Sequence, residues 1–118
     1  MKTRREKMET IKELLCNAVE GISYRWCRVE NHNKKNIPEC KYLSELLTFE
    51  DGKMTVSDCS GEEAFATKEV SHKDVFRAWD KFKNDYNRHY QDAINGHDDA
   101  ITADVFFQLV VLDDVIFG

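Results

Sequence analysis

The densest group of side chains able to do chemistry lies between residues 92 and 99, where three aspartates and a histidine occur. Asp92, His97, Asp98 and Asp99 could in principle bind a divalent cation. Calcium loops, however, need oxygen ligands at alternating positions, and Ile94 stands where a ligand is required after Asp92. The spacing therefore predicts a solvated polar loop and no metal site.

The cysteines are the next candidates for chemistry. They are Cys16, Cys27, Cys40 and Cys59. No two form a CxxC pair, so a structural zinc site is not expected, and without a secretion signal the thiols are predicted to be free and to pack as small core or boundary residues. Cys27 and His32 could be a nucleophile and a base, but no sequence context positions them.

The recognised catalytic and phosphate-binding motifs are missing from the sequence, which has no GxGxxG, GxxxxGK, HExxH or GxSxG. We therefore expect no catalytic residues, no cofactor and no enzymatic activity. A site assembled from residues distant in the sequence stays open at this stage.

A basic and aromatic segment, residues 24–41, suggests an alternative function in binding single-stranded nucleic acid or nucleotides. Aromatic rings can stack on bases while lysine and arginine neutralise phosphates. The candidate residues are Tyr24, Arg25, Trp26, Arg28, Lys34 and Lys35. The competing interpretation directs Ile22, Tyr24 and Trp26 to the core and the arginines to solvent. A pI near 5.3 favours this second interpretation.

The net charge of -5 is concentrated in the second half of the chain. Residues 1–59 hold 11 Lys and Arg against 10 Asp and Glu, whereas residues 60–118 hold 6 against 12. This distribution favours a protein with a basic surface over nucleic acid as the partner. By analogy with small acidic proteins of bacteria or phages, we expect a protein-binding module of the inhibitor, immunity or mimic type. Its expected partner-binding residues are Asp92, Asp98, Asp99, Asp113, Asp114 and Phe117.

The last residues of the sequence place Val115, Ile116 and Phe117 directly after two aspartates. An apolar segment with an acidic rim either packs back on its own domain or belongs to an interface. Packing on its own domain is the simpler expectation, and a homodimer contact through this segment stays open.

Length and composition indicate one domain, residues 1–118, with 42% hydrophobic and 33% charged residues. The longest apolar run, Val105–Leu112, is interrupted by Gln108 and is far shorter than the roughly 20 residues that span a bilayer. The charged, amphipathic first residues do not resemble a signal peptide. We expect a cytoplasmic protein without membrane contact.

Two helices are predicted with clear boundaries, at Thr3–Gly21 and Ser71–Asn95. The second has an aromatic stripe at steps of three and four residues. The stripe consists of Val75, Trp79, Phe82, Tyr86, Tyr90 and Ala93. We expect most of it to be core, with Ser71 as N-cap. The run Val105–Leu112 suits a helix or a buried strand, and we favour the helix.

Strands are predicted at Ile22–Glu30 and Glu63–Val70, with a hairpin turn at Asp51-Gly52 between Tyr42–Glu50 and Lys53–Asp58. Residues 43–47 fit a helical turn as an alternative. The fold class expected from these elements is α+β with two layers. An antiparallel sheet of three or four strands would be covered by the N-terminal helix and the long second helix, with a short final helix or strand.

Overall fold

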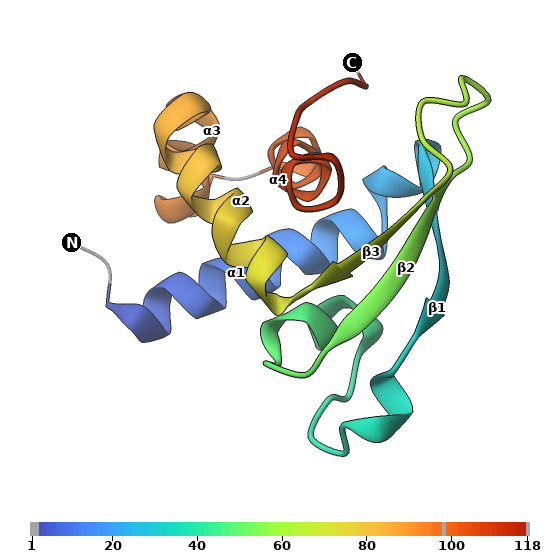
Figure 1. The fold of residues 1–118 in the computed structure, drawn as a ribbon. Coiled ribbons are helices and arrows are strands. Elements are labelled where there is room, and N and C mark those ends of the chain that lie inside the picture. Colours follow the sequence, from blue (N-terminus) through green and yellow to red (C-terminus); the bar gives the residue numbers. More distant parts are fainter. Residues whose placement is uncertain (1–2, 98, 118) are drawn as a thin grey trace.

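The computed structural model describes residues 3–97 and 99–117, which form an antiparallel sheet with helices packed against it (Figure 1). The α+β prediction is confirmed, with three strands and a short final helix. The α-helices are α1 (Arg4–Val19), α2 (His72–Asp85), α3 (Asn87–Ile94) and α4 (Ala100–Leu112). The strands are β1 (Cys27–His32), β2 (Lys53–Asp58) and β3 (Thr67–Ser71). Three short 3₁₀ helices are η1 (Ile22–Arg25), η2 (Lys34–Asn36) and η3 (Leu43–Thr48).

The sheet has the order β1-β2-β3 and is antiparallel throughout. Met54 and Val56 of β2 alternate with half-buried or exposed polar residues, and Met54 pairs with the buried Val70 of β3. This alternation gives one apolar face and one polar face. The register shifts between Val29 and Asn31 of β1, which marks a β-bulge at one edge. Figure 1 shows the α-helices gathered on one side of the sheet.

Helix α4 is the central element of the core. Every residue from Thr102 to Val111 is buried, and the helix contacts α1, α2, α3, η1 and β3. A helix that is apolar on all sides is stable only when neighbours surround it. The helical interpretation of this segment is thus confirmed, and surrounding contacts outweigh the β propensity of its valines and phenylalanines. None of the described helices is both long and apolar enough to cross a membrane.

Helix α1 begins as predicted. The Thr3 side chain accepts a hydrogen bond from the backbone N–H of Glu6, the usual role of an N-cap. Its buried face, which includes Ile11, Leu14 and Leu15, packs chiefly on α4 and η3. The strands themselves are contacted by α2, α4, η1 and η3.

The predicted single helix Ser71–Asn95 is wrong at one residue. Ser71 is the N-cap as predicted and forms a capping box with Asp74, but Tyr86 leaves the helical conformation with φ -128° and ψ 44°, and α2 ends before it. The Asn87 side chain donates to the carbonyl of Lys83, in competition with the backbone ladder. Asparagine and aspartate are weak helix formers for this reason, and they flank the break.

The aromatic stripe is mainly core, as predicted. Its ring contacts converge on Trp79 and Phe82, which pack against Tyr90 of α3 and Phe106 of α4 at centroid distances of 5.3–6.3 Å. Val75, Trp79, Phe82 and Ala93 are buried, whereas Tyr86 and Tyr90 are half-buried. The break between α2 and α3 therefore leaves the stripe intact.

The predicted strand Ile22–Glu30 is wrong in its first half. Residues 22–25 form η1, and β1 begins only at Cys27. Trp26 is buried, but Tyr24, expected on the same face, is 56% exposed. Apolar residues at every second position therefore belong here to a 3₁₀ turn and not to a strand. Of Tyr24 and Trp26, only Trp26 points into the core.

The predicted hairpin at Asp51-Gly52 is also wrong. Residues 43–48 form η3, the helical-turn alternative, and the partners of β2 are β1 and β3. Among the described residues, the glycines with positive φ are Gly61 and Gly96, so Gly52 does not supply a left-handed turn. A β-carbon at Gly52 would instead overlap the carbonyl of Leu46. This glycine is required because η3 approaches the backbone closely.

We predict that Gly52→Ala lowers the free energy of unfolding by about 3 kcal/mol, because backbone atoms must move to admit the methyl group. Gly61→Ala is the matched control: Gly61 has φ 87° but open space around it, so only conformational strain of about 1 kcal/mol applies. Urea unfolding measures both changes. Equal losses would contradict the close-approach explanation.

Candidate protein-binding surfaces

The aspartates predicted to bind a partner lie at opposite ends of α4. Asp92 and Asp99 precede its first residue, while Asp113 and Asp114 follow its last. A helix of 13 residues is about 20 Å long, so these carboxylates do not share one surface. Asp98 lies outside the described residues.

Asp99 has a local structural role as the N-cap of α4. Its carboxylate accepts a hydrogen bond of 2.9 Å from the backbone N–H of Thr102. This hydrogen bond is the main reason why the pKa of Asp99 lies below its ordinary value. The Thr102 hydroxyl also contacts Nδ1 of His89 at 2.8 Å, which joins α3 to the start of α4.

Asp113 is paired with two cations. Its carboxylate lies 3.3 Å from Nε of Arg77 and 4.0 Å from Nζ of Lys81, and Lys81 also donates to its carbonyl at 2.6 Å. Asp114 is exposed, and its carboxylate accepts from the backbone N–H of Val115. Much of the negative charge after α4 is thus compensated within the chain.

Phe117 is 7% exposed and stacks on Trp26, with ring centroids 5.2 Å apart. The expectation that the apolar segment packs on its own domain is confirmed. A partner could contact the Phe117 ring only if the segment left this position.

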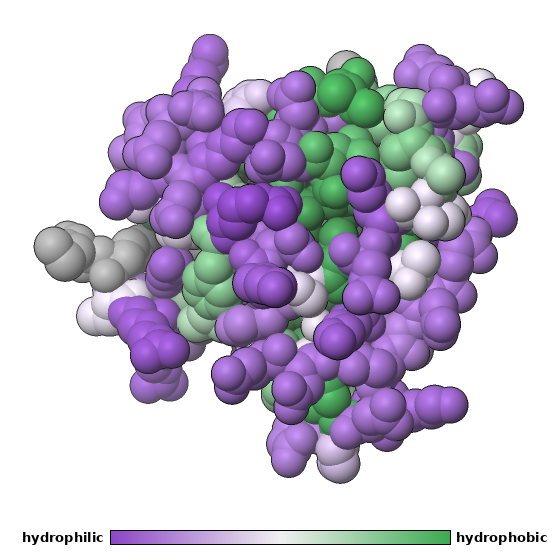
Figure 2. Space-filling model, in the orientation of Figure 1, coloured by the Kyte–Doolittle hydropathy of each residue, from purple (hydrophilic) through white to green (hydrophobic). Residues whose placement is uncertain are grey.

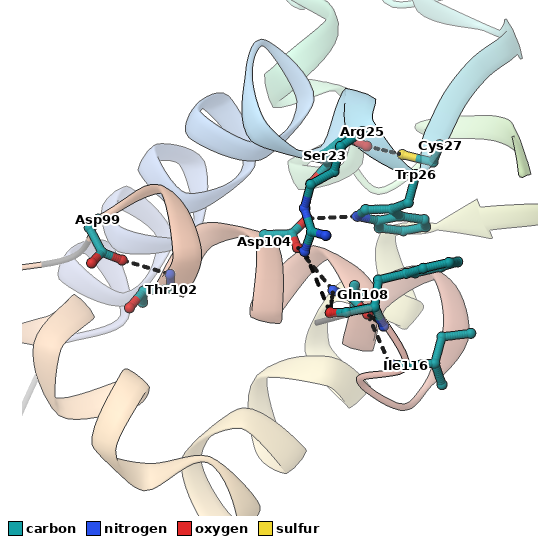
Figure 3. Close-up of polar contacts among 10 residues, drawn as sticks. Ser23, Arg25, Trp26, Cys27, Asp99, Thr102, Asp104, Gln108 and Ile116 are labelled. Atoms are coloured by element: carbon teal, nitrogen blue, oxygen red, sulfur yellow. Dashed lines mark hydrogen bonds and ion pairs between the residues drawn. The ribbon is translucent and has the colours of Figure 1, made fainter. Parts of the chain in front are cut away.

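A buried polar network holds this end of the structure together, and it is drawn in Figure 3. Asp104 on α4 is 2% exposed and accepts hydrogen bonds from three residues in or next to η1. The donors are Ser23 Oγ at 2.6 Å, Arg25 Nη2 at 2.6 Å and Trp26 Nε1 at 2.7 Å. Nε2 of Gln108, one helical turn further along α4, donates to the same carboxylate at 2.9 Å. A buried carboxylate is tolerated because donors surround it.

Gln108 extends this network to the last described residues. Its Oε1 accepts from the backbone N–H groups of Ile116 and Phe117, both at 2.9 Å, and its Nε2 donates to the Phe117 carbonyl at 3.0 Å. The side-chain amide therefore binds an extended segment as a neighbouring strand would. Sequence reasoning missed this role, although two polar residues four apart in an apolar run lie on one helix face and could have revealed it.

The basic and aromatic candidates for nucleic-acid binding are separated by the structure. Trp26 is 1% exposed, and the Arg25 guanidinium is paired with Asp104. Tyr24, Arg28 and Lys35 are exposed, and Lys34 is half-buried. Of the two rings expected to stack on bases, that of Trp26 is thus inside the core and that of Tyr24 is exposed.

A groove between α1 and the start of η3 gathers carboxylates that the sequence did not single out. We call it the acidic groove; its volume is about 590 Å³. Its lining consists of Glu9, Lys12, Glu13, Cys16, Asn17, Glu20, Tyr42, Ser44 and Glu45. Four carboxylates therefore face one lysine around Tyr42, which is 63% exposed. The glutamates of α1 recur at helical spacing, but their meeting with Tyr42 and Glu45 depends on how η3 packs.

The thiols of Cys16, in the acidic groove, and of the buried Cys27 are protonated at neutral pH. Cys16 Sγ donates to a Glu20 carboxylate oxygen at 3.0 Å, and this bond, burial and the negative charge of Glu20 raise the pKa of Cys16. Burial raises the pKa of Cys27 to about 12. Because the thiolate is the reactive form, neither environment activates a nucleophile. All four cysteines are free as predicted, but Cys16 and Cys59 are exposed and are not core fillers.

Metal ligands do not converge in the part of the chain that the structure describes. Among residues 3–97 and 99–117, no group of three or more His, Cys, Asp or Glu could hold a metal ion. No protein-family model, curated protein or solved structure matches the chain. The functional argument therefore depends on the surfaces themselves.

We predict that Asp99→Ala destabilises the protein by about 1 kcal/mol, whereas Asp99→Asn is close to wild type because asparagine also caps helices. The pKa of Asp99 is lower in the folded protein than in the unfolded chain. Its contribution to the free energy of unfolding is therefore fully present at a pH above the ordinary carboxyl pKa, and it is lost as the pH falls through the pKa of the folded state. Unfolding measured from pH 7 to pH 2 tests this. An equal loss at neutral pH in both variants would rule out the capping role.

We predict that Asp104→Asn lowers the free energy of unfolding by about 3 kcal/mol, because the new amide directs N–H groups at buried donors and removes the charge paired with Arg25. The control is Asp114→Asn, at an exposed carboxylate, with an expected change within about 0.5 kcal/mol. Urea unfolding followed by tryptophan fluorescence compares the two. A loss below about 1 kcal/mol at Asp104 would contradict a stabilising network.

Proposed function

We propose that the protein binds a basic segment of another protein in the acidic groove, as a non-enzymatic module of the inhibitor, immunity or mimic type. The observation that supports this most directly is the convergence of four carboxylates and one exposed aromatic ring on a single concave surface. Neither end of α4 combines these features. The proposal keeps the basic partner expected from the sequence and moves the contact to a different surface.

The charge of the groove suits a cationic ligand. Four glutamates against one lysine give a net charge of -3 along its lining. Glu9, Glu13 and Glu20 are exposed to solvent, so they would attract a basic partner at long range and lose strength with salt. Hydrogen bonds orient two of the carboxylates, since Glu20 accepts from Cys16 and Glu45 accepts from the backbone N–H of Lys41 at 2.8 Å.

Tyr42 supplies the apolar part of the proposed contact. Exposed tyrosines are frequent energetic centres of protein interfaces, since a rigid ring offers a large contact area. A lysine or arginine over its face would gain a cation–π interaction while its charge meets the surrounding glutamates. The expected ligand is thus a segment with at least one basic side chain next to an apolar one.

Nucleic acid is a poorer ligand for this groove, because carboxylates repel phosphates. The alternative function in single-stranded nucleic-acid or nucleotide binding has only Tyr24, Arg28, Lys34 and Lys35 to support it, since Trp26 is buried. We therefore favour the protein partner.

We predict that random 12-residue peptides selected for binding are enriched in lysine and arginine. For such a peptide, the triple variant Glu9→Gln, Glu13→Gln, Glu45→Gln should lose roughly tenfold in affinity at low salt and show a flatter salt dependence. Glutamine retains the hydrogen-bond acceptor of Glu45, so folding is preserved. Fluorescence anisotropy at low and high salt measures both effects.

The control variant is Asp92→Asn with Asp114→Asn, which removes charge outside the groove. It should bind as wild type, whereas Tyr42→Ala should weaken binding roughly tenfold without a change in stability. Selection of peptides without basic residues, or an equal loss in the aspartate variant, would reject the acidic groove as the site.

A further inference from the structure

The segment Asp114–Phe117 reaches the Trp26 ring through one residue in a left-handed conformation. Asp113 has φ 61° and ψ 15° and forms the C-cap of α4. Residues with a β-carbon adopt this conformation at a cost, although aspartate and asparagine tolerate it better than most. If α4 instead continued through Asp113, the strain would vanish and the segment would project away from its own domain.

The contacts that hold the segment do not depend on its covalent connection. Gln108 binds main-chain groups of Ile116 and Phe117, and Trp26 stacks on the Phe117 ring. The turn itself is held by the ion pairs of Asp113 with Arg77 and Lys81, and by hydrogen bonds of its main chain to Lys81 and to the Leu109 carbonyl. The same pocket would therefore accept an identical segment from a second chain.

An apolar surface surrounds this segment. Ile116 is 48% exposed, and the neighbouring Leu112 and Val115 are only half-buried. Figure 2 shows hydrophobic residues in the upper centre of the molecule, where Figure 1 places the end of α4 and the last residues, with hydrophilic residues around them. Contiguous apolar surface with a polar rim is typical of protein interfaces.

We propose that two copies of the chain exchange this segment and form a dimer. Phe117 of each copy stacks on the partner's Trp26, and the partner's Gln108 binds the main chain of residues 116 and 117. Exchange of identical elements reuses the contacts of residues 116 and 117 and removes the strain at both hinges, while the apolar surface around Ile116 is buried between the copies. None of the acidic-groove residues takes part, so the experiments on the dimer and those on the proposed function test separate sites.

Three substitutions at the hinge test the mechanism by analytical ultracentrifugation. Asp113→Asn removes the ion pairs and retains tolerance for the left-handed conformation, so it is the reference. Asp113→Ala should raise the dimer association constant about 30-fold over this reference, because two hinges open per dimer. Asp113→Gly should lower it, since glycine adopts the turn without strain. Equal constants for all three, or a monomeric alanine variant at millimolar concentration, would overturn the exchange.

The exchanged contact itself can be observed without altering the pocket. Isotope-labelled and unlabelled Asp113→Ala protein are mixed in urea and refolded together, and isotope-filtered NOEs are recorded. We expect cross-peaks between the Trp26 ring of one copy and the Phe117 ring of its partner. A dimer without these cross-peaks, or one that persists unchanged after Phe117→Ala, would place the interface elsewhere and refute the proposal.

Discussion

One buried carboxylate, that of Asp104, sets the arrangement of the elements around α4. It lies on the helix that the other three α-helices contact, and its hydrogen-bond partners come from η1, from the adjoining Trp26 and from the next turn of α4. Because an unpaired buried charge is costly, every conformation that removes these donors is disfavoured. Gln108 carries the same constraint to residues 116 and 117, so the network fixes segments about 80 and 10 residues away in the sequence.

This constraint explains why η1 replaces a predicted strand. Ser23, Arg25 and Trp26 all donate to one carboxylate. In a strand, successive side chains point to opposite faces, so Trp26 would point away from the other two. A tight turn brings the three donors to the same side. The period of two in the sequence was therefore a poor guide, since it registers only which residues are apolar and not which polar groups need a common acceptor.

The sequence was most informative where a local rule decides the outcome. Thr3 and the Ser71–Asp74 pair cap their helices because the required donors lie within one turn, and the aromatic stripe is core because its spacing matches a helix face. It was least informative where packing decides. Gly52 predicted a hairpin turn, but a glycine is needed there because the backbone of η3 lies too close for a β-carbon. The break at Tyr86 depends on side-chain competition for backbone groups. The Asp104 network joins residues far apart in the chain, and only its two members on α4 could be paired from spacing.

The same distinction separates the two sets of acidic residues considered for partner binding. The aspartates are dense in the sequence after Arg88, yet Asp99 caps α4 and Asp113 closes the turn that follows it. Aspartate is short, so its carboxylate reaches nearby backbone groups and suits caps and turns. Glutamates on an exposed helix face hold their carboxylates further from the backbone, where a partner can meet them. Charge density in a sequence thus indicates acidity, but the length of the side chain and its place on an element decide whether that charge serves the fold or remains available for binding.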